Sequence, residues 1–392
     1  MPWKESGVVE ERMRFVRDYE RAEMTMAELC RVYGIARKTG YAMVERWREQ
    51  GAEGLKDRSR SPLRHPNQTA PEIEAALLEL RRAHMRWGPR KLQEILRRSR
   101  DPVPAASTIG ALLKRAGLVV DRRRRRRTPP YTQPFAGADG PNQVWCADFK
   151  GHFHTRDGER IDPFTLSDAH SRYLLRCQAV EKTDTEAVRS ISEAAFREYG
   201  LPGAIRTDNG APFASRAIAG LSRLAVYWMK LNIVPERIEP GHPEQNGRHE
   251  RMHRTLKEET AHPAAANRRA QQRAFDQFRR EYNEQRPHEA LAMRTPAAVY
   301  DGPGRPYPGR VPEPEYDSGM QVRGVCEGGK FRWKGEFVFL SKALAGERIG
   351  LKPVAEEGWR VYFAAFPIAH FNSREFRVGP LRLGSYEEEA KP

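Results

Sequence analysis

The sequence predicts a multidomain protein: N-terminal all-α units, a central α/β domain and a C-terminal small antiparallel β-barrel. Three observations predict this fold class. Apolar residues in the first third recur at helical spacing, and from Val144 onward short apolar strands alternate with helices. Residues 317–385 alternate between apolar and polar, as in KFRWKGEFVFL, and carry glycine turn signals. A chain of 392 residues is long enough for two to four such domains.

Domain boundaries are expected where the composition changes. Two segments resemble linkers. Residues 126–143 are rich in basic residues and proline, and the stretch DGPGRPYPGRVPEPE is rich in glycine and proline. The expected parts are a first helical unit (1–60), a second helical unit (61–125), a basic and Pro-rich linker (126–143), the α/β core (144–300), a Gly/Pro-rich linker (301–316) and the small β domain (317–392).

Positive charge is concentrated in the first third. The formal net charge is +16, and residues 1–130 hold 30 Lys and Arg against 17 Asp and Glu. This predicts a phosphate-rich partner, because neutralising nucleic-acid phosphates releases counterions and gives affinity. A merely solvated charged surface would not explain the asymmetry. A membrane partner is disfavoured because no apolar run approaches the ~20 residues that span a bilayer and the N-terminus lacks an apolar signal-peptide core.

The stretch MTMAELCRVYGIARKTGYAMVERWREQG has a helix-turn-helix pattern. Thr25 can cap the first helix, Gly34 supplies the turn, and the second helix starts near Arg37. The expected inward face consists of Leu29, Val32, Tyr41, Val44 and Trp47.

Basic and polar residues open the second of these helices, where a recognition helix contacts bases and phosphates. Arg37, Lys38 and Thr39 are therefore candidate DNA ligands. The alternative is a small helical bundle without a ligand, and the charge of this third of the chain favours DNA.

A second helix-turn-helix unit is expected from helices at 72–85, 89–98 and 107–115. Its predicted core is Ile73, Leu77, Leu80, Leu92, Ile95, Leu96, Ile109, Leu112 and Leu113. Six consecutive arginines follow, then an extended segment able to lie along a DNA backbone. These candidate DNA ligands are Arg122, Arg123, Arg124, Arg125, Arg126 and Arg127.

The central region predicts a mixed sheet with three converging acids. Strands are expected at VWCADFK, FTLSDAH, YLLRCQAV and AIRTD, with a helix over 185–199. Asp148 lies in the first strand, Asp208 ends the last, and Glu250 opens a helix after the turn HPEQNG. Carboxylates held by separate rigid elements suit Mg²⁺, which prefers hard oxygen ligands.

The segments WCADFK, RTDNGAPF, HPEQNGRHERMHRTLK and YNEQRPHEAL resemble the core motifs of bacterial insertion-sequence transposases and retroviral integrases. The resemblance covers roughly residues 8–300. It implies an RNase H-like fold, a catalytic trio of Asp148, Asp208 and Glu250, and two Mg²⁺ (or Mn²⁺) ions. It further implies metal-dependent cleavage of DNA and strand transfer. No covalent protein–DNA intermediate is expected.

The implied partners are double-stranded DNA, as the terminal repeats of a mobile element and as target DNA, and further copies of the chain on that DNA. No membrane partner is expected. Four widely spaced cysteines without a C-x-x-C pair indicate neither a disulfide framework nor a structural zinc site. A bacterial cytoplasmic location near the nucleoid is expected. Retroviral integrases carry an N-terminal His/Cys zinc module, which this sequence lacks.

Two glutamates compete for the third position of the trio. Glu244 follows Asp208 at the spacing usual in the resembled family, with 35 residues between them, whereas 41 residues separate Asp208 from Glu250. The local motif favours Glu250, because the family's glutamate follows a Pro-x-x-x-Gly turn by three residues and opens a helix. Glu250 is therefore the expected ligand.

Other candidates near the trio have competing interpretations. Asp168 is expected to make structural hydrogen bonds rather than bind metal. His242, His249 and His253 could suggest zinc, but DNA contact or hydrogen bonding around the metal ligands is the better interpretation.

Arg254 and Lys257, at i+4 and i+7 from Glu250, are expected to hold a DNA backbone. Arg286 and His288 could contact DNA or serve packing, and the sequence leaves both open.

Two other functions remain as alternatives. One is a transposase-derived regulator that binds DNA without cutting it, which the intact acidic trio disfavours. The other is a simple nuclease of the same fold, which the paired DNA-reading units disfavour.

Overall fold

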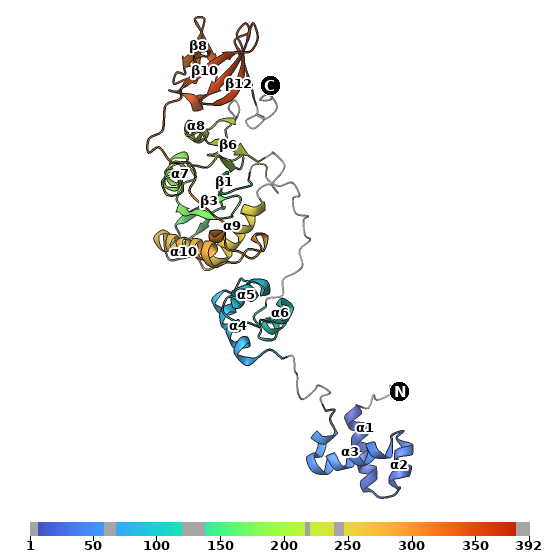
Figure 1. The fold of residues 1–392 in the computed structure, drawn as a ribbon. Helices are drawn as coiled ribbons and strands as arrows, with labels where there is room; N and C mark the ends of the chain where they lie inside the picture. The colour runs from blue at the N-terminus through green and yellow to red at the C-terminus, as the bar shows by residue number, and fades with distance from the viewer. Residues whose placement is uncertain (1–6, 59–67, 120–137, 216–219, 239–246, 382–392) are drawn as a thin grey trace. The chain divides into compact units, whose positions relative to one another are not determined.

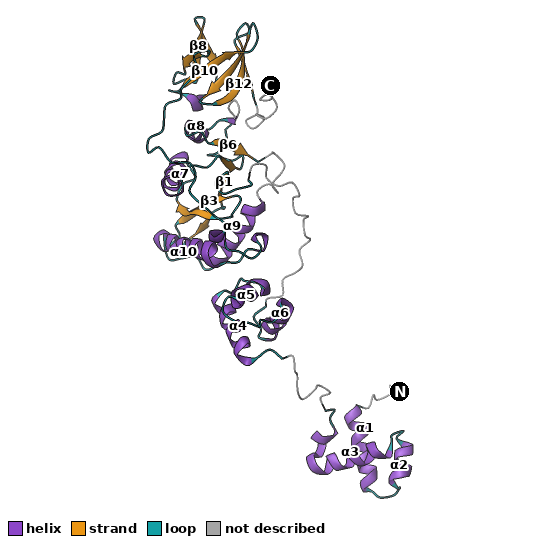
Figure 2. Cartoon of the chain, in the orientation of Figure 1, coloured by secondary structure: helices purple, strands orange, loops and turns teal. Residues whose placement is uncertain are grey.

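A computed structural model describes residues 7–58, 68–119, 138–215, 220–238 and 247–381, and the chain divides into two compact units, Met1–Thr69 and Ala70–Pro392. The first is helical, and the second contains helices and three sheets (Figure 2). Among the described residues no helix is both long and apolar enough to cross a membrane.

The first unit is built from α1 (Val8–Glu20), α2 (Met26–Val32), α3 (Arg37–Gln50) and the short 3₁₀ helix η1 (Gly51–Leu55). The Thr25 side chain caps α2 in a capping box with Glu28, and Gly34 adopts a φ of 64° between α2 and α3. The predicted helix-turn-helix is confirmed in its cap, its turn and its two helices.

The predicted inward face of this unit is confirmed for Leu29, Val44 and Trp47 but not for Val32 and Tyr41. Val32 is 69% exposed and Tyr41 57% exposed, so the expectation that both lie inside is wrong. Val32 is the last residue of its helix, where Met26, Leu29 and Cys30 already fill the core. In α3 the expected Val44 is buried and Trp47 packs partly buried against the same core, while Gly40 and Met43 are buried where Tyr41 was expected.

The second helical part comprises α4 (Pro71–Ala83), α5 (Pro89–Arg97) and α6 (Ala106–Arg115), and α4 and α5 begin with proline. The predicted core is confirmed. Fully or partly buried in one cluster are Ile73, Leu77, Leu80, Leu92, Ile95, Leu96, Ile109, Leu112 and Leu113. Trp87, which precedes α5, joins them with 1% exposure.

A six-stranded mixed sheet forms the centre of the second unit. Its strands are β1 (Val144–Phe149), β2 (Phe153–His154), β3 (Arg160–Asp168), β4 (Leu174–Val180), β5 (Ala204–Thr207) and β6 (Val234–Arg237). Along the sheet the order is β2-β3-β1-β5-β6, with β4 also paired to β3. β1 runs antiparallel to β3 and parallel to β5. This confirms the predicted mixed α/β core.

Helices cover both faces of this sheet (Figure 1). One face packs on α7 (Thr185–Tyr199) and α8 (Arg223–Lys230), and the other on α9 (Gly247–Thr260) and α10 (Arg268–Arg280). Because side chains alternate along a strand, Trp145 and Ala147 of β1 point to the α7–α8 side. Asp148 therefore faces α9.

After α10 the chain passes through single-turn helical segments at Glu281–Gln285, Glu289–Leu291 and Pro296–Ala298. The β domain then consists of β7 (Gln321–Gly324), β8 (Lys330–Trp333), β9 (Glu336–Phe339), the 3₁₀ helix η7 (Lys342–Leu344), β10 (Arg348–Pro353), β11 (Gly358–Phe363), β12 (Phe366–Asn372) and β13 (Arg377–Pro380).

The expected C-terminal barrel is not confirmed. Five strands form an antiparallel sheet in the order β13-β12-β11-β10-β7, and β8 and β9 form a separate hairpin, so the described strands do not close into one sheet. The predicted turn at Lys334 and Gly335 is confirmed, with φ of 43° and 93° in the two-residue loop of the hairpin.

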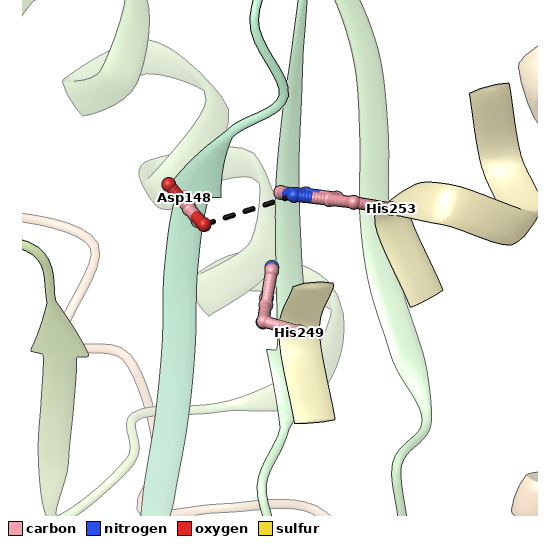
Figure 3. A group of neighbouring side chains, drawn as sticks. All are labelled: Asp148, His249 and His253. Carbon is pink, nitrogen blue, oxygen red and sulfur yellow. Dashed lines mark ion pairs between the residues drawn. The ribbon is translucent and has the colours of Figure 1, made fainter. Parts of the chain in front are cut away.

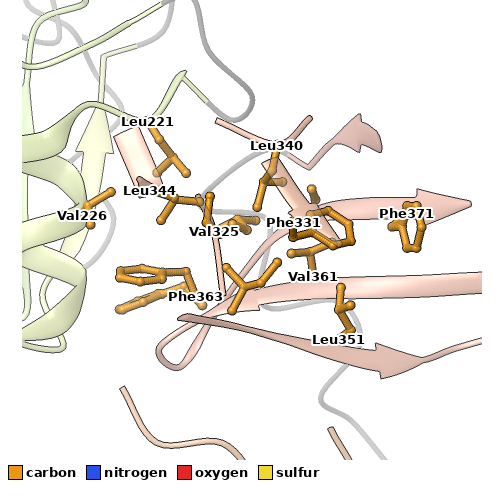
Figure 4. Packing of buried hydrophobic residues seen from close by; sticks show 14 of the residues in the cluster. Leu221, Val226, Val325, Phe331, Leu340, Leu344, Leu351, Val361, Phe363 and Phe371 are labelled. Atoms are coloured by element: carbon orange, nitrogen blue, oxygen red, sulfur yellow. The ribbon is translucent and has the colours of Figure 1, made fainter. Parts of the chain in front are cut away.

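The C-terminal sheet shares a hydrophobic core with α8. Leu221, Val226 and Met229 from the central domain belong to the same buried cluster as Phe331, Phe363 and the other apolar residues of the sheet. Figure 4 shows Val226 and Leu344 on either side of this contact. The helix α8 is thus buried by the central sheet on one side and by the C-terminal sheet on the other.

Candidate active site

Asp148 lies near the end of β1 on the face covered by α9. Its partner across the antiparallel pair is Thr165 of β3, and this register places both side chains on the same face of the sheet. The aspartate side chain is 14% exposed, so it reaches solvent at the edge of the core.

Asp208 follows β5 directly. β1 and β5 are parallel, with Val144 opposite Ala204 and Cys146 opposite Arg206. If this pairing is extended by two residues, position 148 lies level with position 208, and both positions are at the carboxyl ends of neighbouring strands. The Gly210 amide donates a hydrogen bond of 3.1 Å to Oδ1 of Asp208, which orients this carboxylate in its turn.

Glu250 is in the first turn of α9 and is exposed. The helix packs on the sheet through a stripe at i, i+3, i+4 and i+7, made of His249, Met252, His253 and Leu256. Glu250 therefore stands beside the buried stripe, on the helix that contacts the strand of Asp148.

Two buried histidines of α9 meet the sheet at Asp148 (Figure 3). Oγ1 of Thr165 lies 2.7 Å from Nε2 of His249 and 2.6 Å from Nε2 of His253. The same hydroxyl is 3.2 Å from the backbone oxygen of Asp148, and Nδ1 of His253 is 3.7 Å from Oδ2 of Asp148. Oγ of Ser167 lies 3.3 Å from Nδ1 of His249.

The chemistry of these contacts limits where the protons can be. Burial lowers the pKa of His249 to about 4. Burial also lowers the pKa of His253 well below its usual value, with nearby His249 and Lys150 adding to the effect. Each imidazole is then neutral near pH 7, with one donor and one acceptor nitrogen. Because Thr165 has one hydroxyl proton and faces two Nε2 atoms, at least one imidazole donates to it.

Asp148, His249 and His253 each offer an atom within 4.8 Å of the others, so these three could hold a metal ion. Among the described residues Asp208 and Glu250 do not join that group. Both imidazole Nε2 atoms already contact Thr165, so the two histidines connect α9 to β3 and β1. Hydrogen bonding was one of the two roles expected for these histidines, and contact with DNA stays a prediction.

The remaining candidate residues are distributed over both units. Arg37, Lys38 and Thr39 are exposed at the start of α3, as a DNA-contacting role requires. On α9, Arg254 is exposed and Lys257 half-buried. Outside the described residues lie Glu244, His242 and Arg122, Arg123, Arg124, Arg125, Arg126 and Arg127.

Asp168 has the structural role that the sequence predicts. It is 1% exposed. Its Oδ1 accepts a hydrogen bond of 2.8 Å from the Asn142 amide, and its Oδ2 accepts bonds from the amide and hydroxyl of Ser171 at 2.7 and 2.6 Å. These three donors compensate the buried charge.

Thr165 and Ser167 were not predicted from the sequence. They can be recognised only from the pairing of β3 with β1, which places alternate residues of β3 on the same face of the sheet as Asp148. Arg286 and His288, left open by the sequence, are both buried, and Arg286 pairs with Glu259 at 2.8 Å.

Comparison with known protein families agrees with this architecture. Residues 138–243 and 231–296 each match an integrase core domain, residues 11–62 a helix-turn-helix domain, and residues 39–113 a homeodomain-like domain. Residues 320–377 match the C-terminal domain of IS481 family transposases.

Two curated proteins are similar over most of their own length. An uncharacterized 39.2 kDa protein of insertion element IS476 from Xanthomonas euvesicatoria is 32% identical over 258 residues, which cover 64% of this chain and 71% of that protein. An uncharacterized 31.7 kDa protein of insertion element IS407 from Burkholderia multivorans is 30% identical over 244 residues, covering 61% and 85%.

Among solved structures, the integrase catalytic core domain of HTLV-2 in complex with magnesium aligns with a TM-score of 0.33 and 17% identity. The alignment covers 42% of this chain and 99% of that domain.

Proposed function

Since this chain belongs to the insertion-element transposases with an integrase core domain, we propose that it cleaves DNA at the ends of a mobile element and joins those ends to target DNA. The observation that carries the proposal is the parallel register of β1 and β5, which, extended two residues beyond its paired positions, would bring Asp148 level with Asp208. Glu250 stands on the helix that packs across Asp148.

The trio Asp148, Asp208 and Glu250 would hold two divalent ions, Mg²⁺ or Mn²⁺. The donor set fits these hard cations, because all three side chains offer carboxylate oxygens and arise from three separate elements. When bound, such ions lower the pKa of an attacking hydroxyl and neutralise charge on the phosphate.

The chain's own residues would orient the ligands and the DNA. His253 and Thr165 fix the strand of Asp148 relative to α9, and so fix Glu250 relative to Asp148. Arg254 and Lys257, one and two turns beyond Glu250, would bind the DNA backbone beside the trio.

The proposed reaction has two in-line displacements at one site. Water first attacks a phosphodiester at the element end and releases a 3′-hydroxyl. That hydroxyl then attacks a phosphodiester of the target and releases a second 3′-hydroxyl. No side-chain nucleophile is required.

The helical units would read the terminal repeats, with Arg37, Lys38 and Thr39 at the start of α3 facing the DNA. An element has two ends, so joining both requires at least two copies of the chain on the DNA. The C-terminal sheet would add non-specific contacts to DNA or to another copy.

The test is a joining assay with purified protein, labelled element-end DNA and a target plasmid, with and without Mg²⁺. We expect labelled DNA joined to the plasmid only with the metal, and none with Asp148→Asn or Asp208→Asn. Specific end binding without any cleavage or joining, in folded protein with Mg²⁺ or Mn²⁺, would instead identify a DNA-binding regulator. Cleavage without joining would identify a nuclease.

A further inference from the structure

A cationic cavity lies beside α9, outside the acidic trio. It measures about 110 Å³ and is bounded by α5, α9 and the segment 282–288 of the second unit. Several water molecules would fit, since each takes about 30 Å³ in the liquid. Four cations line it, namely Lys91, Arg172, Arg251 and Arg286, together with the acid Asp168.

The acids near this cavity are already occupied. Asp168 accepts three hydrogen bonds from Asn142 and Ser171. Glu259 pairs with Arg286 at 2.8 Å, and Glu289 pairs with Arg90 at 3.2 Å. Among the described residues that line the cavity, four are cationic and one, Asp168, is acidic. Burial, followed by the charge of Arg286, lowers the pKa of Lys91 to about 8.

A buried polar atom also lines this cavity. His288 is 7% exposed, and its Nε2 has no hydrogen-bond partner among the described residues. The ring hydrogen-bonds the backbone of Tyr282, and burial followed by Lys91 lowers its pKa to about 3. Because the other ring nitrogen donates to that backbone group, the neutral Nε2 is a hydrogen-bond acceptor, so it would be satisfied by a water molecule or another donor inside the cavity and not by a phosphate oxygen.

The geometry points to a phosphate site: we propose that Lys91 and Arg251, together with Arg172 and Arg286 on the same wall, bind one phosphodiester group of a DNA strand in this cavity. The inference rests on the proposed function, since it assigns the phosphate to the DNA on which the transposase acts. Lys and Arg donors converging on a small cavity suit tetrahedral phosphate oxygens. Arg251 is exposed and follows Glu250 directly, so a strand held here would pass close to the trio.

The site differs from a general basic surface in that it would contact one particular phosphate. It joins α5, which belongs to the second DNA-reading part, to α9, which carries the third acid. Contacts in the same region are His84 to Glu281 at 3.0 Å and Arg86 to Glu258 at 3.3 Å. A strand seated in the cavity would thus be held by both parts together.

The test is a scan of the element-end DNA in which single phosphates are replaced by neutral methylphosphonates. For the wild-type protein we expect one position where replacement weakens binding about tenfold or more, as loss of a charge-assisted hydrogen bond does. Lys91→Gln should weaken binding to unmodified DNA by a similar factor. For this variant, methylphosphonate replacement at that one position should no longer weaken binding, while the effects at all other positions should stay as in the wild type. Arg251→Gln is a second variant, and because Arg251 is exposed its fold should be unaffected.

Arg273→Gln is the matched control, since Arg273 is an exposed arginine of α10 that does not line the cavity. It should keep the wild-type pattern. If folded Lys91→Gln and Arg251→Gln both keep the wild-type sensitivity at every position, the inference is overturned while DNA binding itself stands. If the wild-type protein does not bind end DNA at all, the proposed function fails instead.

Titration with inorganic phosphate in the absence of DNA separates the two sources of the anion. Weak, Lys91-dependent phosphate binding together with a position-specific methylphosphonate effect supports the inference. Tight phosphate binding without any position-specific effect would mean that the cavity takes a free phosphate, and the DNA assignment would be wrong.

Discussion

Nδ1 of His253 lies 3.7 Å from Oδ2 of Asp148, while Nε2 of the same ring lies 2.6 Å from Oγ1 of Thr165. One buried imidazole thus connects the helix that carries Glu250 to two strands of the central sheet. Any displacement of α9 along the sheet would break these contacts. The proposed activity should therefore depend on residues that need not touch the DNA.

Glu250→Gln should abolish both cleavage and joining, because it keeps the shape of the side chain and removes the charge that would hold a cation. Binding to end DNA should survive, which a gel-shift assay of the same preparation measures. Glu244→Gln is the matched control and should retain most activity, because the motif that selects Glu250 as the metal ligand makes Glu244 a residue of the preceding turn. The opposite result, an inactive Glu244→Gln and an active Glu250→Gln with both variants folded, would contradict this prediction. It would mean that the spacing from Asp208 identifies the third ligand better than the local motif does.

Thr165→Val should lower kcat while leaving the Kd for DNA unchanged. The substitution removes the hydroxyl shared by His249 and His253 and should cost about 1–3 kcal/mol in the free energy of unfolding, because buried polar groups lose their partner. Loss of such supporting contacts commonly reduces activity about 10–100-fold. Thr165→Ser restores the hydroxyl and should recover most activity. If Thr165→Ser is as inactive as Thr165→Val, the hydroxyl is not the operative group.

Affinity for end DNA should fall as the pH rises from 7 to 9. The pKa of Lys91 in the free protein is about 8, so above that pH binding of a phosphate must take up a proton. Around Lys91 stand Arg172, Arg286, Glu259 and Glu289. Arginine and glutamate ordinarily keep their charge over this range. Fluorescence anisotropy of labelled DNA at constant ionic strength measures the effect. Lys91→Gln should show a flatter pH dependence, and an equally steep one would exclude Lys91 as the cause.

Replacing Arg37 and Lys38 together by glutamine should weaken binding to end DNA and reduce its salt dependence. Each lost phosphate contact lowers the slope of log affinity against log salt by about 0.9. The comparison is Arg21→Gln in the same unit, an arginine with a 67% exposed side chain that lies outside α3. Equal salt slopes for the wild type and the double variant would place the DNA contacts elsewhere in the chain.

Much of the fold could be predicted because the signals are local. Thr25 caps α2, Gly34 turns the chain, and α7 spans Thr185–Tyr199 as expected, since capping and periodicity depend on nearby residues. The exact edge of the buried face of α3, where Gly40 and Met43 replace the expected Tyr41, could not be predicted, because it depends on which side chains meet α1 and α2. Likewise, the burial of α8 on two sides could not be predicted: Leu224 through Met229 are all buried, because two sheets cover the helix.

The candidate site likewise contains residues that local motifs predict and residues that only the tertiary structure brings together. Asp148 and Asp208 are predicted from their motifs alone, and the register of β1 and β5, extended two residues beyond its paired positions, would bring them level. The roles of Thr165 and Ser167 could not be inferred, since hydroxyl residues in a strand are common and only the pairing of β3 with β1 brings them to α9. Lys91 was hidden for a similar reason, as it lies almost two hundred residues from Arg286 in the sequence.

The burial of α8 between two sheets has a consequence for the mechanics of the chain. Leu221, Val226 and Met229 pack into the core of the C-terminal sheet, although they precede that sheet by about a hundred residues in the sequence. A protease that cut only within residues 301–316 would leave two fragments still held together by this apolar contact. Heat or denaturant should then unfold the central sheet and the C-terminal sheet in a single cooperative transition. The C-terminal sheet should therefore move together with the central domain, unlike a domain tethered by a free linker.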